Sequence, residues 1–527
     1  MKPKLPAICS IYKASNYTFL ISSVITIAYN FILLGYVVQN TDVLSASGLG
    51  ILVSVVVIVF IFSYAVFSLL TLISLLAVKT FFVIVTAING IAIYFMTIYQ
   101  VVLDRTMIEN ILNTRYSESV ELFSLNLISY ILIFGLLPGL LLTKIKVTKL
   151  DRLRVLANAL IAIIVSFSFL YTNSTSWLWI DKHASNLGGK ILPWSYIVNS
   201  ARHLSSINRS TVGQKILPDG LFINNNKMVF VLVIGETARA DNFSLYGYSK
   251  LTNPKLQHQS NMLVFNNTKS CTTYTTGSLA CMLAPSNQHL GYEALPTYLA
   301  RQGVDVQWRT NNWGEPPIEV SSYVKAGELR STCSGNGCNL DEVLLTNLTD
   351  TIKSSDKEKV FVVLHTKGSH GPSYYWRYTK EFNQFKPVCR DEEISKCSSE
   401  ALINAYNNTI LYTDHFLSKV INKLDKIKNT SIALMYISDH GESLGEHGLY
   451  LHGTPYSFAP EYQKNIPFLI WLSDKYVEEK KINISEMRQA PNHSQFNVFH
   501  TVLGAFGFES PVYELSLIHI SEPTRPY

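Results

Sequence analysis

Residues 228–237 read M-V-F-V-L-V-I-G-E-T, an apolar run that ends in a glycine and a carboxylate. A short, uninterrupted apolar run rich in valine is typical of a strand that is buried on both faces, as in a parallel sheet. Stretches with helical periodicity, such as 293–301 and 400–424, separate it from similar runs. Those runs are 304–308, 360–365, 432–437 and 466–472. Strands that alternate with helices predict an α/β domain with a mainly parallel sheet.

Side chains that can bind a metal stand at the ends of three of these runs. Glu236 follows the first run, His365 and His370 stand at the end of the run at 360–365, and Asp439 and His440 follow the run at 432–437. Functional sites in open α/β sheets form beyond the carboxyl ends of the strands. We therefore expect these side chains to share one edge of the sheet.

The segment 438–453 reads S-D-H-G-E-S-L-G-E-H-G-L-Y-L-H-G and is the strongest indication of chemistry. Carboxylates and imidazoles are both good zinc ligands, and Asp439 and His440 are adjacent at a strand end. Glu236 is costly to bury without a partner, which a metal would provide. Each feature alone has a structural alternative, namely a simple turn for D-H-G and a helix start for Glu236. Together they predict a metal site.

A nucleophile is expected in the hydroxyl-rich stretch S-C-T-T-Y-T-T-G-S-L-A-C at 270–281. The alternative is a polar surface loop. The spacing alone does not choose among Thr272, Thr273, Thr275, Thr276 and Ser278.

Apolar residues are concentrated in the first third of the 527-residue chain, which is 48% hydrophobic overall. Runs with at most one charge cover 14–78, 81–103, 122–143 and 155–180. A helix needs about 20 apolar residues to cross a membrane, and the first run is long enough for two. Because a polar break at 39–48 divides that run, we expect five transmembrane helices. A cleaved signal peptide does not fit, since four more spans follow the first.

Basic residues predict the orientation of these helices. Lys2, Lys4 and Lys13 precede the first helix, and five Lys and Arg residues lie within 144–154. Under the positive-inside rule the N-terminus is cytoplasmic, and five spans place the chain after about residue 176 outside the cytoplasm. The net charge of +6 does not gather in one soluble patch, so we expect no nucleic-acid partner. The scarcity of charge within the spans argues against a transporter.

Six of the seven cysteines stand in close pairs beyond the predicted spans, whereas Cys9 lies on the predicted cytoplasmic side. The pairs are Cys271 with Cys281, Cys333 with Cys338, and Cys389 with Cys397. Local disulfides in an oxidising compartment account for this pairing. A zinc cluster is the alternative, but only the middle pair approaches the usual spacing.

Aromatic residues mark the segment that follows the spans. Trp177, Trp179, Trp194 and Tyr196 favour a segment at the membrane surface, where such rings concentrate. An ordinary linker is the alternative.

Five motifs, in this order, resemble those of the phosphoethanolamine transferases. They are G-E-T-A-R at 235–239, C-x-x-x-T at 271–275, G-S-H-G-P at 368–372, S-D-H-G-E-S at 438–443 and Y-L-H-G at 450–453. That family modifies lipid A or lipooligosaccharide and includes the mobilised colistin-resistance enzymes. The resemblance covers nearly the whole chain. It implies a five-helix transmembrane domain and a periplasmic α/β/α domain of the alkaline-phosphatase and sulfatase type.

The resemblance also implies the catalytic residues. Thr275 would be the nucleophile, and the principal zinc ion would be held by Glu236, Thr275, Asp439 and His440. His370 and His452 match histidines that hold the phosphoryl group or a second zinc ion, and one of them would protonate the leaving group.

Substrate-binding roles follow for His370, His452, His365 and Asn312, and for two residues of a loop between spans, Asn110 and Thr114. The latter two match a helix that contacts the lipid donor, and their spacing of four predicts one shared helical face.

The resemblance implies ping-pong transfer of phosphoethanolamine from phosphatidylethanolamine to lipid A or the lipopolysaccharide core. A zinc-activated threonine would carry the group. The product is less anionic and attracts cationic peptides such as polymyxin less strongly. We expect a monomeric enzyme of the bacterial inner membrane, with membrane lipids as its partners.

The alternatives are a phosphoglycerol transferase, a sulfatase-like hydrolase, and a non-catalytic membrane receptor for lipid headgroups. Cys271 is followed by T-T-Y-T and lacks the sequence context from which sulfatases make formylglycine. The intact nucleophile and ligand set argues against a receptor.

Two stretches depart from the family pattern. After Asn311 and Asn312 the chain continues W-G-E-P-P, without the lysine that colistin-resistance members carry, so the acceptor can differ. From Ser516 the chain reads S-L-I-H-I-S-E-P-T-R-P-Y, unlike a family C-terminus. The expected parts are a membrane domain at 1–176, an interfacial linker at 177–226, a catalytic domain at 227–515 and a non-native tail at 516–527.

Overall fold

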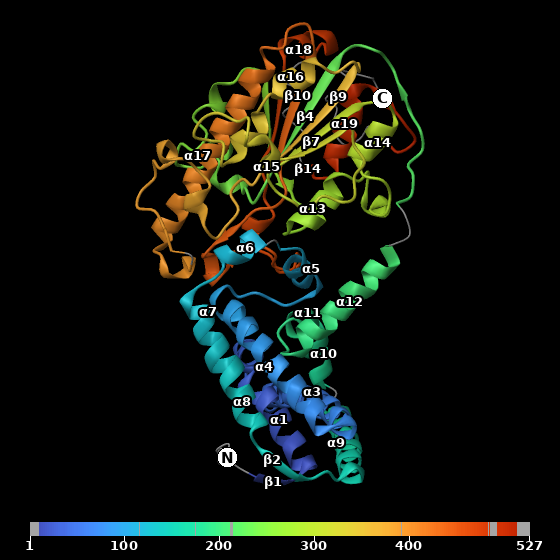
Figure 1. Ribbon diagram of the computed structural model, residues 1–527, viewed down its shortest axis with the longest axis vertical. Helices are drawn as coiled ribbons and strands as arrows, with labels where there is room; N and C mark the ends of the chain where they lie inside the picture. The colour runs from blue at the N-terminus through green and yellow to red at the C-terminus, as the bar shows by residue number, and fades with distance from the viewer. Residues whose placement is uncertain are drawn as a thin grey trace, which may run out of the picture. The chain divides into compact units, whose positions relative to one another are not determined.

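The structure is a computed structural model that describes residues 10–114, 116–173, 175–210, 214–391, 393–482, 484 and 493–513. The chain forms two compact units (Figure 1). The first comprises Met1–Leu112 and Phe123–Ile207, and the second comprises Asn113–Leu122 and Asn208–Tyr527. Cys9 and the predicted tail from Ser516 lie outside the described residues. The division into four parts stays a prediction.

The helices of the first unit match the predicted spans. Four are long and apolar enough to cross a membrane: α3 (Ala46–Ile73), α4 (Leu75–Ile98), the helical segment Leu125–Thr143 and Arg152–Tyr171 of α9 (Arg152–Thr172). The segment Leu125–Thr143 contains α7 (Leu125–Tyr130), a π-helical turn and α8 (Leu137–Thr143). Helices α1 (Ala14–Ala28) and α2 (Phe31–Gln39) meet at 49° and count as a fifth span if the bent pair crosses as one.

The segment after the spans is also helical and is bonded to them. It contains α10 (Thr175–Lys182), α11 (Ala184–Gly188) and α12 (Trp194–Ser210). Asn30, at the break between α1 and α2, donates to the Leu192 carbonyl at 2.8 Å and accepts from the Leu192 amide at 2.9 Å. The Trp194 indole donates to Ser63 of α3 at 2.9 Å. These bonds satisfy polar groups that the interior buries, whereas the position of the segment at the membrane surface stays a prediction.

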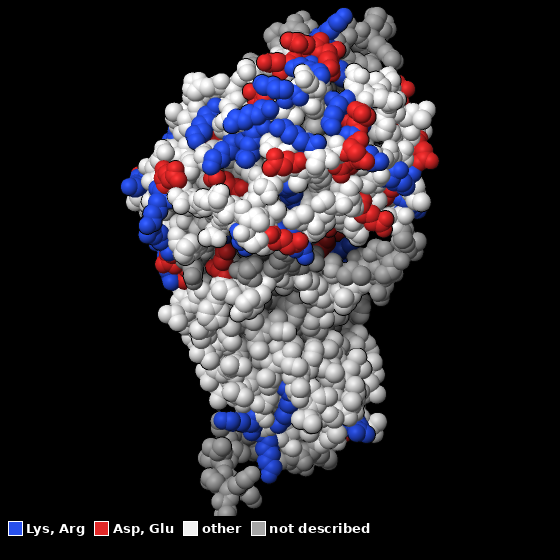
Figure 2. Space-filling model, turned by 45° about the horizontal axis from the view of Figure 1, so that its top comes forward, with Lys and Arg blue, Asp and Glu red and all other residues white. Residues whose placement is uncertain are grey.

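The segments whose lysines predict a cytoplasmic location lie together within the first unit. Strand β1 (Ser10–Lys13) pairs with β2 (Lys146–Lys149), and Lys79 donates to the carbonyls of Thr143 and Ile145. Figure 2 shows blue side chains at one end of this otherwise nearly white unit. This grouping fits the predicted orientation.

The polar stretch between α4 and α7 contains α5 (Arg105–Asn113) and α6 (Tyr116–Glu121). Helix α5 ends at Asn113, and Thr114 is the next residue. That Asn110 and Thr114 share one helical face stays a prediction. Their role in binding the donor stays a prediction.

The second unit contains a seven-stranded sheet in the order β5-β13-β10-β4-β9-β7-β8. The predicted runs form β4 (Met228–Gly235), β7 (Asp305–Thr310), β9 (Lys359–His365), β10 (Ser431–Ser438) and β13 (Phe468–Leu472). Strand β13 is antiparallel to both of its neighbours, so the sheet is mixed but mostly parallel. The edge strands β5 (Met262–Phe265) and β8 (Ser322–Lys325) were not predicted.

Helices cover both faces of the sheet, as the sequence predicts. Alternate residues of β4, from Met228 to Ile234, pack in one core with α13 (Thr275–Met282), α14 (Leu295–Arg301) and α19 (Asn497–Phe506). The long helix α17 (Ser399–Leu424) lies on the opposite side of the sheet in Figure 1. All three predicted disulfides are present.

Candidate metal and nucleophile site

Strand register brings the predicted site residues to one edge of the sheet. Gly235 pairs with Ser438, and His365 pairs with both Ile234 and Thr310, so four neighbouring strands end at the same level. The residues that follow these ends, Glu236, Asn312 and Asp439, therefore come together. The gathering predicted from the strand ends is confirmed.

Glu236 lies at the centre of this group and is only 1% exposed. Its Oε2 accepts from Asn312 Nδ2 at 2.6 Å, and its Oε1 accepts from the Thr237 hydroxyl at 2.6 Å. Burial and the neighbouring Asp439 carboxylate raise the pKa of Glu236 to about 7. Asn312, expected to bind substrate, thus holds Glu236 in place.

Asp439 and His440 direct acceptor atoms toward each other. Asp439 Oδ1 accepts from the backbone amides of Thr237 and His440 at 2.9 and 2.7 Å. His440 Nδ1 lies 2.9 Å from the Gly441 carbonyl, which can only accept, so Nδ1 carries the proton and Nε2 presents a lone pair. Burial raises the pKa of Asp439 to about 6 and lowers the pKa of His440 to about 4.

These two residues leave buried atoms that a cation would satisfy. Asp439 Oδ2 and His440 Nε2 lie 3.3 Å apart, both buried and both without a hydrogen-bond partner in the described part of the chain. His440 Nε2 also lies 3.5 Å from Glu236 Oε1. Ligand atoms of Glu236, His440 and His452 all lie within 4.8 Å of one another. Two carboxylates and imidazole nitrogens are a donor set suited to zinc, so these residues fit the expected ion.

Thr275 is the first residue of α13, and its hydroxyl lies 3.3 Å from Glu236 Oε2. The Thr272 hydroxyl instead bonds the Tyr274 carbonyl at 2.8 Å, and the Thr273 hydroxyl bonds the Thr454 carbonyl at 2.6 Å. Ser278 bonds Thr272 at 2.9 Å. The structure thus favours Thr275 among hydroxyls that the sequence spacing left undecided.

His452 is oriented by a carboxylate that the prediction did not include. Its Nδ1 lies 3.1 Å from Oε1 of Glu442, and the Tyr374 hydroxyl donates to Glu442 Oε2 at 3.0 Å. Glu442 is fully buried, which raises its pKa to about 8. It stands within the D-H-G-E motif, so the sequence held a signal for it. The ring centroids of His452 and His440 are 4.3 Å apart.

The two remaining histidines differ in position. The His370 ring lies 5.4 Å from that of His452, and its Nδ1 donates to the Gly371 carbonyl at 2.7 Å. Burial lowers the pKa of His370 well below its usual value. His365 is fully buried, with Nδ1 3.4 Å from the Thr310 hydroxyl and 3.8 Å from Glu315. His370 therefore belongs with His452, whereas His365 lies beneath the loop that follows β7.

Gln495 joins the nucleophile loop to the metal-binding strand end. It is fully buried, accepts from the Cys271 amide at 2.8 Å, and donates to the carbonyls of Ser438 and Asp439 at 3.0 and 2.5 Å. Sequence reasoning missed it, since nothing distinguishes this glutamine from others in polar loops.

We expect Gln495→Met to lower the free energy of unfolding by about 2 kcal/mol, because a side chain of similar size leaves buried backbone groups unsatisfied. Turnover should fall more than the affinity for substrate, since Thr275 and Asp439 lose a shared support. Thermal unfolding and steady-state kinetics of the full chain measure both effects. Gln384→Met, at an exposed position, is the control and should change neither. Unchanged kinetics in Gln495→Met would contradict the positioning role.

Comparisons with known proteins identify the family of this chain. Residues 229–508 match the family model for sulfatases, and residues 58–207 match the model for phosphoethanolamine transferases EptA and EptB. The chain is 39% identical over 508 residues to phosphoethanolamine transferase EptA of Helicobacter pylori, covering 94% of this chain and 95% of that protein.

Two solved structures extend the similarity. The integral membrane lipooligosaccharide phosphoethanolamine transferase A of Neisseria meningitidis superposes with a TM-score of 0.88 at 28% identity, covering 98% of this chain and 100% of that chain. The C-terminal periplasmic domain of phosphoethanolamine transferase EptC from Campylobacter jejuni has a TM-score of 0.50 at 39% identity, covering 57% and 95%. Because a phosphoethanolamine transferase at 39% identity matches over nearly the whole length of both chains, this chain belongs to the phosphoethanolamine transferase family of enzymes.

Proposed function

We propose that this chain transfers phosphoethanolamine from phosphatidylethanolamine to lipid A or to the lipopolysaccharide core, through a covalent intermediate on Thr275. The main support is the Thr275 hydroxyl, 3.3 Å from a buried carboxylate oxygen of Glu236. Beside it lie the unsatisfied atoms of Asp439 and His440. The name of the Neisseria relative, a lipooligosaccharide phosphoethanolamine transferase, supports the acceptor class.

Glu236, Thr275, Asp439 and His440 would hold one zinc ion, and His452 and His370 would hold the phosphoryl group or a second ion. When bound, zinc would supply Lewis-acid chemistry that favours the ionised threonine oxygen and offsets negative charge on the phosphoryl group.

The protein's own groups then account for the bonds and protons. Thr275 Oγ1 forms a bond to phosphorus while the bond from phosphorus to the diacylglycerol oxygen breaks. The hydroxyl proton passes to Glu236, whose Oε2 lies 3.3 Å from the Thr275 hydroxyl. In the second half, an acceptor hydroxyl attacks phosphorus and loses its proton to the histidine that gave one up in the first half. The bond to Thr275 breaks, and Glu236 returns its proton to the threonine oxygen.

His452 is the candidate acid for the leaving diacylglycerol. Its Nδ1 lies 3.1 Å from the Glu442 carboxyl, which orients the ring and leaves Nε2 for the site. His370 donates its Nδ1 proton to the Gly371 carbonyl, so the neutral ring offers an acceptor at Nε2. We assign His452 to donating a proton in the first half and to accepting the proton of the incoming hydroxyl in the second, and His370 to binding the phosphoryl group.

The membrane helices of the same chain would keep the enzyme in the membrane that contains its lipids. Donor and acceptor are both lipids, and the predicted orientation puts the second unit on the periplasmic side of the inner membrane. Each transfer adds an ammonium group and weakens the attraction of cationic peptides.

Metal removal and lipid analysis test the proposal. We expect chelation of the detergent-purified full chain to lower diacylglycerol release from phosphatidylethanolamine by at least about 100-fold, and zinc to restore it. Lipid A or core oligosaccharide from cells that express the chain should gain phosphoethanolamine by mass spectrometry. An unchanged rate in protein shown to be metal-free would refute the zinc assignment. Unmodified lipid A and core would refute the acceptor.

A further inference from the structure

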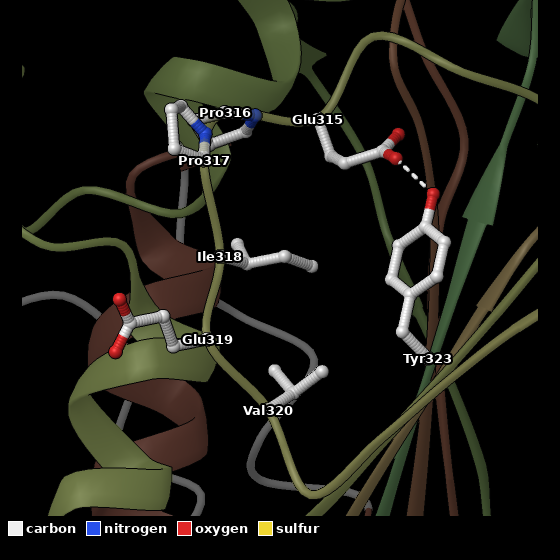
Figure 3. A pocket seen from close by; sticks show the side chains of 7 residues that line it. All are labelled: Glu315, Pro316, Pro317, Ile318, Glu319, Val320 and Tyr323. Carbon is white, nitrogen blue, oxygen red and sulfur yellow. Dashed lines mark hydrogen bonds between the residues drawn. The ribbon is translucent and has the colours of Figure 1, made fainter.

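The loop between β7 and β8 lines an open cavity of about 680 Å³ whose lining carries carboxylates and no lysine or arginine. The lining residues run from Glu315 to Val320 and include Tyr323 (Figure 3). In Figure 3 the Ile318, Val320 and Tyr323 side chains border one space, with Glu315 at its upper end. Apolar walls and a carboxylate suit a small cation attached to a short carbon chain.

Glu315 holds a carboxylate oxygen that the described residues leave unsatisfied. One oxygen accepts from the Tyr323 hydroxyl, as the dashed line in Figure 3 shows. The other, Oε2, is buried without a hydrogen-bond partner, and His365 Nδ1 lies 3.8 Å away, beyond hydrogen-bond distance. The side chain is 14% exposed. A buried acceptor without a donor is unfavourable, and the N–H groups of a cation would satisfy this oxygen.

The backbone that precedes this carboxylate lies against the nucleophile. Gly314 has φ of +107°, and a Cβ at Gly314 would lie only 3.2 Å from Cγ2 of Thr275. Glu315 therefore follows directly on the backbone that contacts the threonine that would bear the phosphoryl group. In phosphoethanolamine two methylene groups separate the phosphate oxygen from the ammonium, so a headgroup on Thr275 has to extend beyond the threonine to a nearby group.

We propose that Glu315, supported by Tyr323, is the binding site for the primary ammonium of the ethanolamine headgroup, in the lipid donor and in the intermediate on Thr275. The inference rests on the proposed function and adds the residue that distinguishes a headgroup with an ammonium from a neutral one. The carboxylate accepts hydrogen bonds from the ammonium while phosphorus faces Thr275. The loop thus selects by charge what Thr275 then transfers.

The test compares two lipids on the full chain in detergent. Phosphatidylethanolamine is paired with phosphatidylpropanol, whose terminal methyl group replaces the ammonium at nearly equal size, and diacylglycerol release is measured. We expect Glu315→Gln to lower kcat/KM for phosphatidylethanolamine by about 10- to 100-fold, the range for a lost charge-assisted hydrogen bond. The slow rate with phosphatidylpropanol should not change. Tyr323→Phe should shift the same preference by a smaller factor.

Glu319→Gln is the matched control, because Glu319 lines the same cavity but is exposed. It should leave the preference unchanged. Equal losses of kcat/KM on both lipids in Glu315→Gln would show a structural role, such as support of His365, and would overturn the inference. An unchanged preference for phosphatidylethanolamine over phosphatidylpropanol, in a Glu315→Gln protein that unfolds at the parental temperature, would also overturn it. A parent protein that releases no diacylglycerol from phosphatidylethanolamine would instead overturn the proposed function.

Discussion

Replacing Thr275 by valine should abolish phosphoethanolamine transfer while the fold stays intact. Valine has nearly the shape of threonine, and the side chain is 9% exposed at the first position of α13, so little packing is lost. The hydroxyl 3.3 Å from Glu236 is the group that would form the bond to phosphorus. Loss of a catalytic nucleophile lowers kcat by about 10⁴-fold or more. Diacylglycerol release from a fluorescent phosphatidylethanolamine measures the effect.

Thr276→Val and Thr275→Ser provide the controls. Thr276 is the next residue of the same helix, and its substitution should leave kcat within about threefold of the parent if the nucleophile assignment holds. Serine keeps the hydroxyl, so Thr275→Ser should retain measurable turnover. Without an acceptor, mass spectrometry of the parent should find the added phosphoethanolamine on the peptide with Thr275 and not in Thr275→Val. Full activity in Thr275→Val would remove the nucleophile from the mechanism.

The central strands and the edge where the site forms could be predicted, and the reason is physical. Strands β4 and β10 are unbroken apolar runs because both of their faces are buried. Parallel strands end at one edge, so Glu236 and Asp439 had to meet there. The edge strands β5 and β8 have only four residues each, too few for a pattern to emerge.

Other features depend on contacts that a local pattern does not contain. The antiparallel direction of β13 is set by its connections, since hydropathy is the same in either direction. Gln495 bonds an amide 224 residues away, at Cys271. The choice of Thr275 among neighbouring hydroxyls required the bonds of Thr272 and Thr273. Sequence thus predicted the family and the edge of the sheet, whereas the partners of individual atoms needed the fold.

Asp439→Asn should remove the metal and yet raise the thermal stability of the metal-free protein. Asparagine keeps the Oδ1 acceptor for the amides of Thr237 and His440. Its Nδ2 would stand 3.3 Å from His440 Nε2 and donate to the lone pair that now faces an unsatisfied carboxylate oxygen. The substitution also removes the charge of Asp439, which lies beside the buried carboxylate of Glu236 and contributes to the raised pKa of Glu236. Zinc affinity should fall by more than about 100-fold, because a direct ligand is lost.

Asp414→Asn separates this effect from a general response to losing a buried carboxylate. Asp414 of α17 is also fully buried, but both of its oxygens accept from backbone amides, those of Lys255 and Leu256 at 3.0 and 2.9 Å. An amide nitrogen there would face a donor, so this variant should lose about 1–3 kcal/mol of unfolding free energy and keep its zinc. Calorimetry of metal-free samples and zinc titration measure both quantities. Replacing aspartate by asparagine should therefore stabilise the site of Asp439 and destabilise the site of Asp414. Of these two carboxylates, Asp439 is the one with an oxygen that lacks a donor within the described chain. Lower stability in metal-free Asp439→Asn than in the metal-free parent would mean that this oxygen is satisfied without a cation, and the zinc site would lose its physical basis.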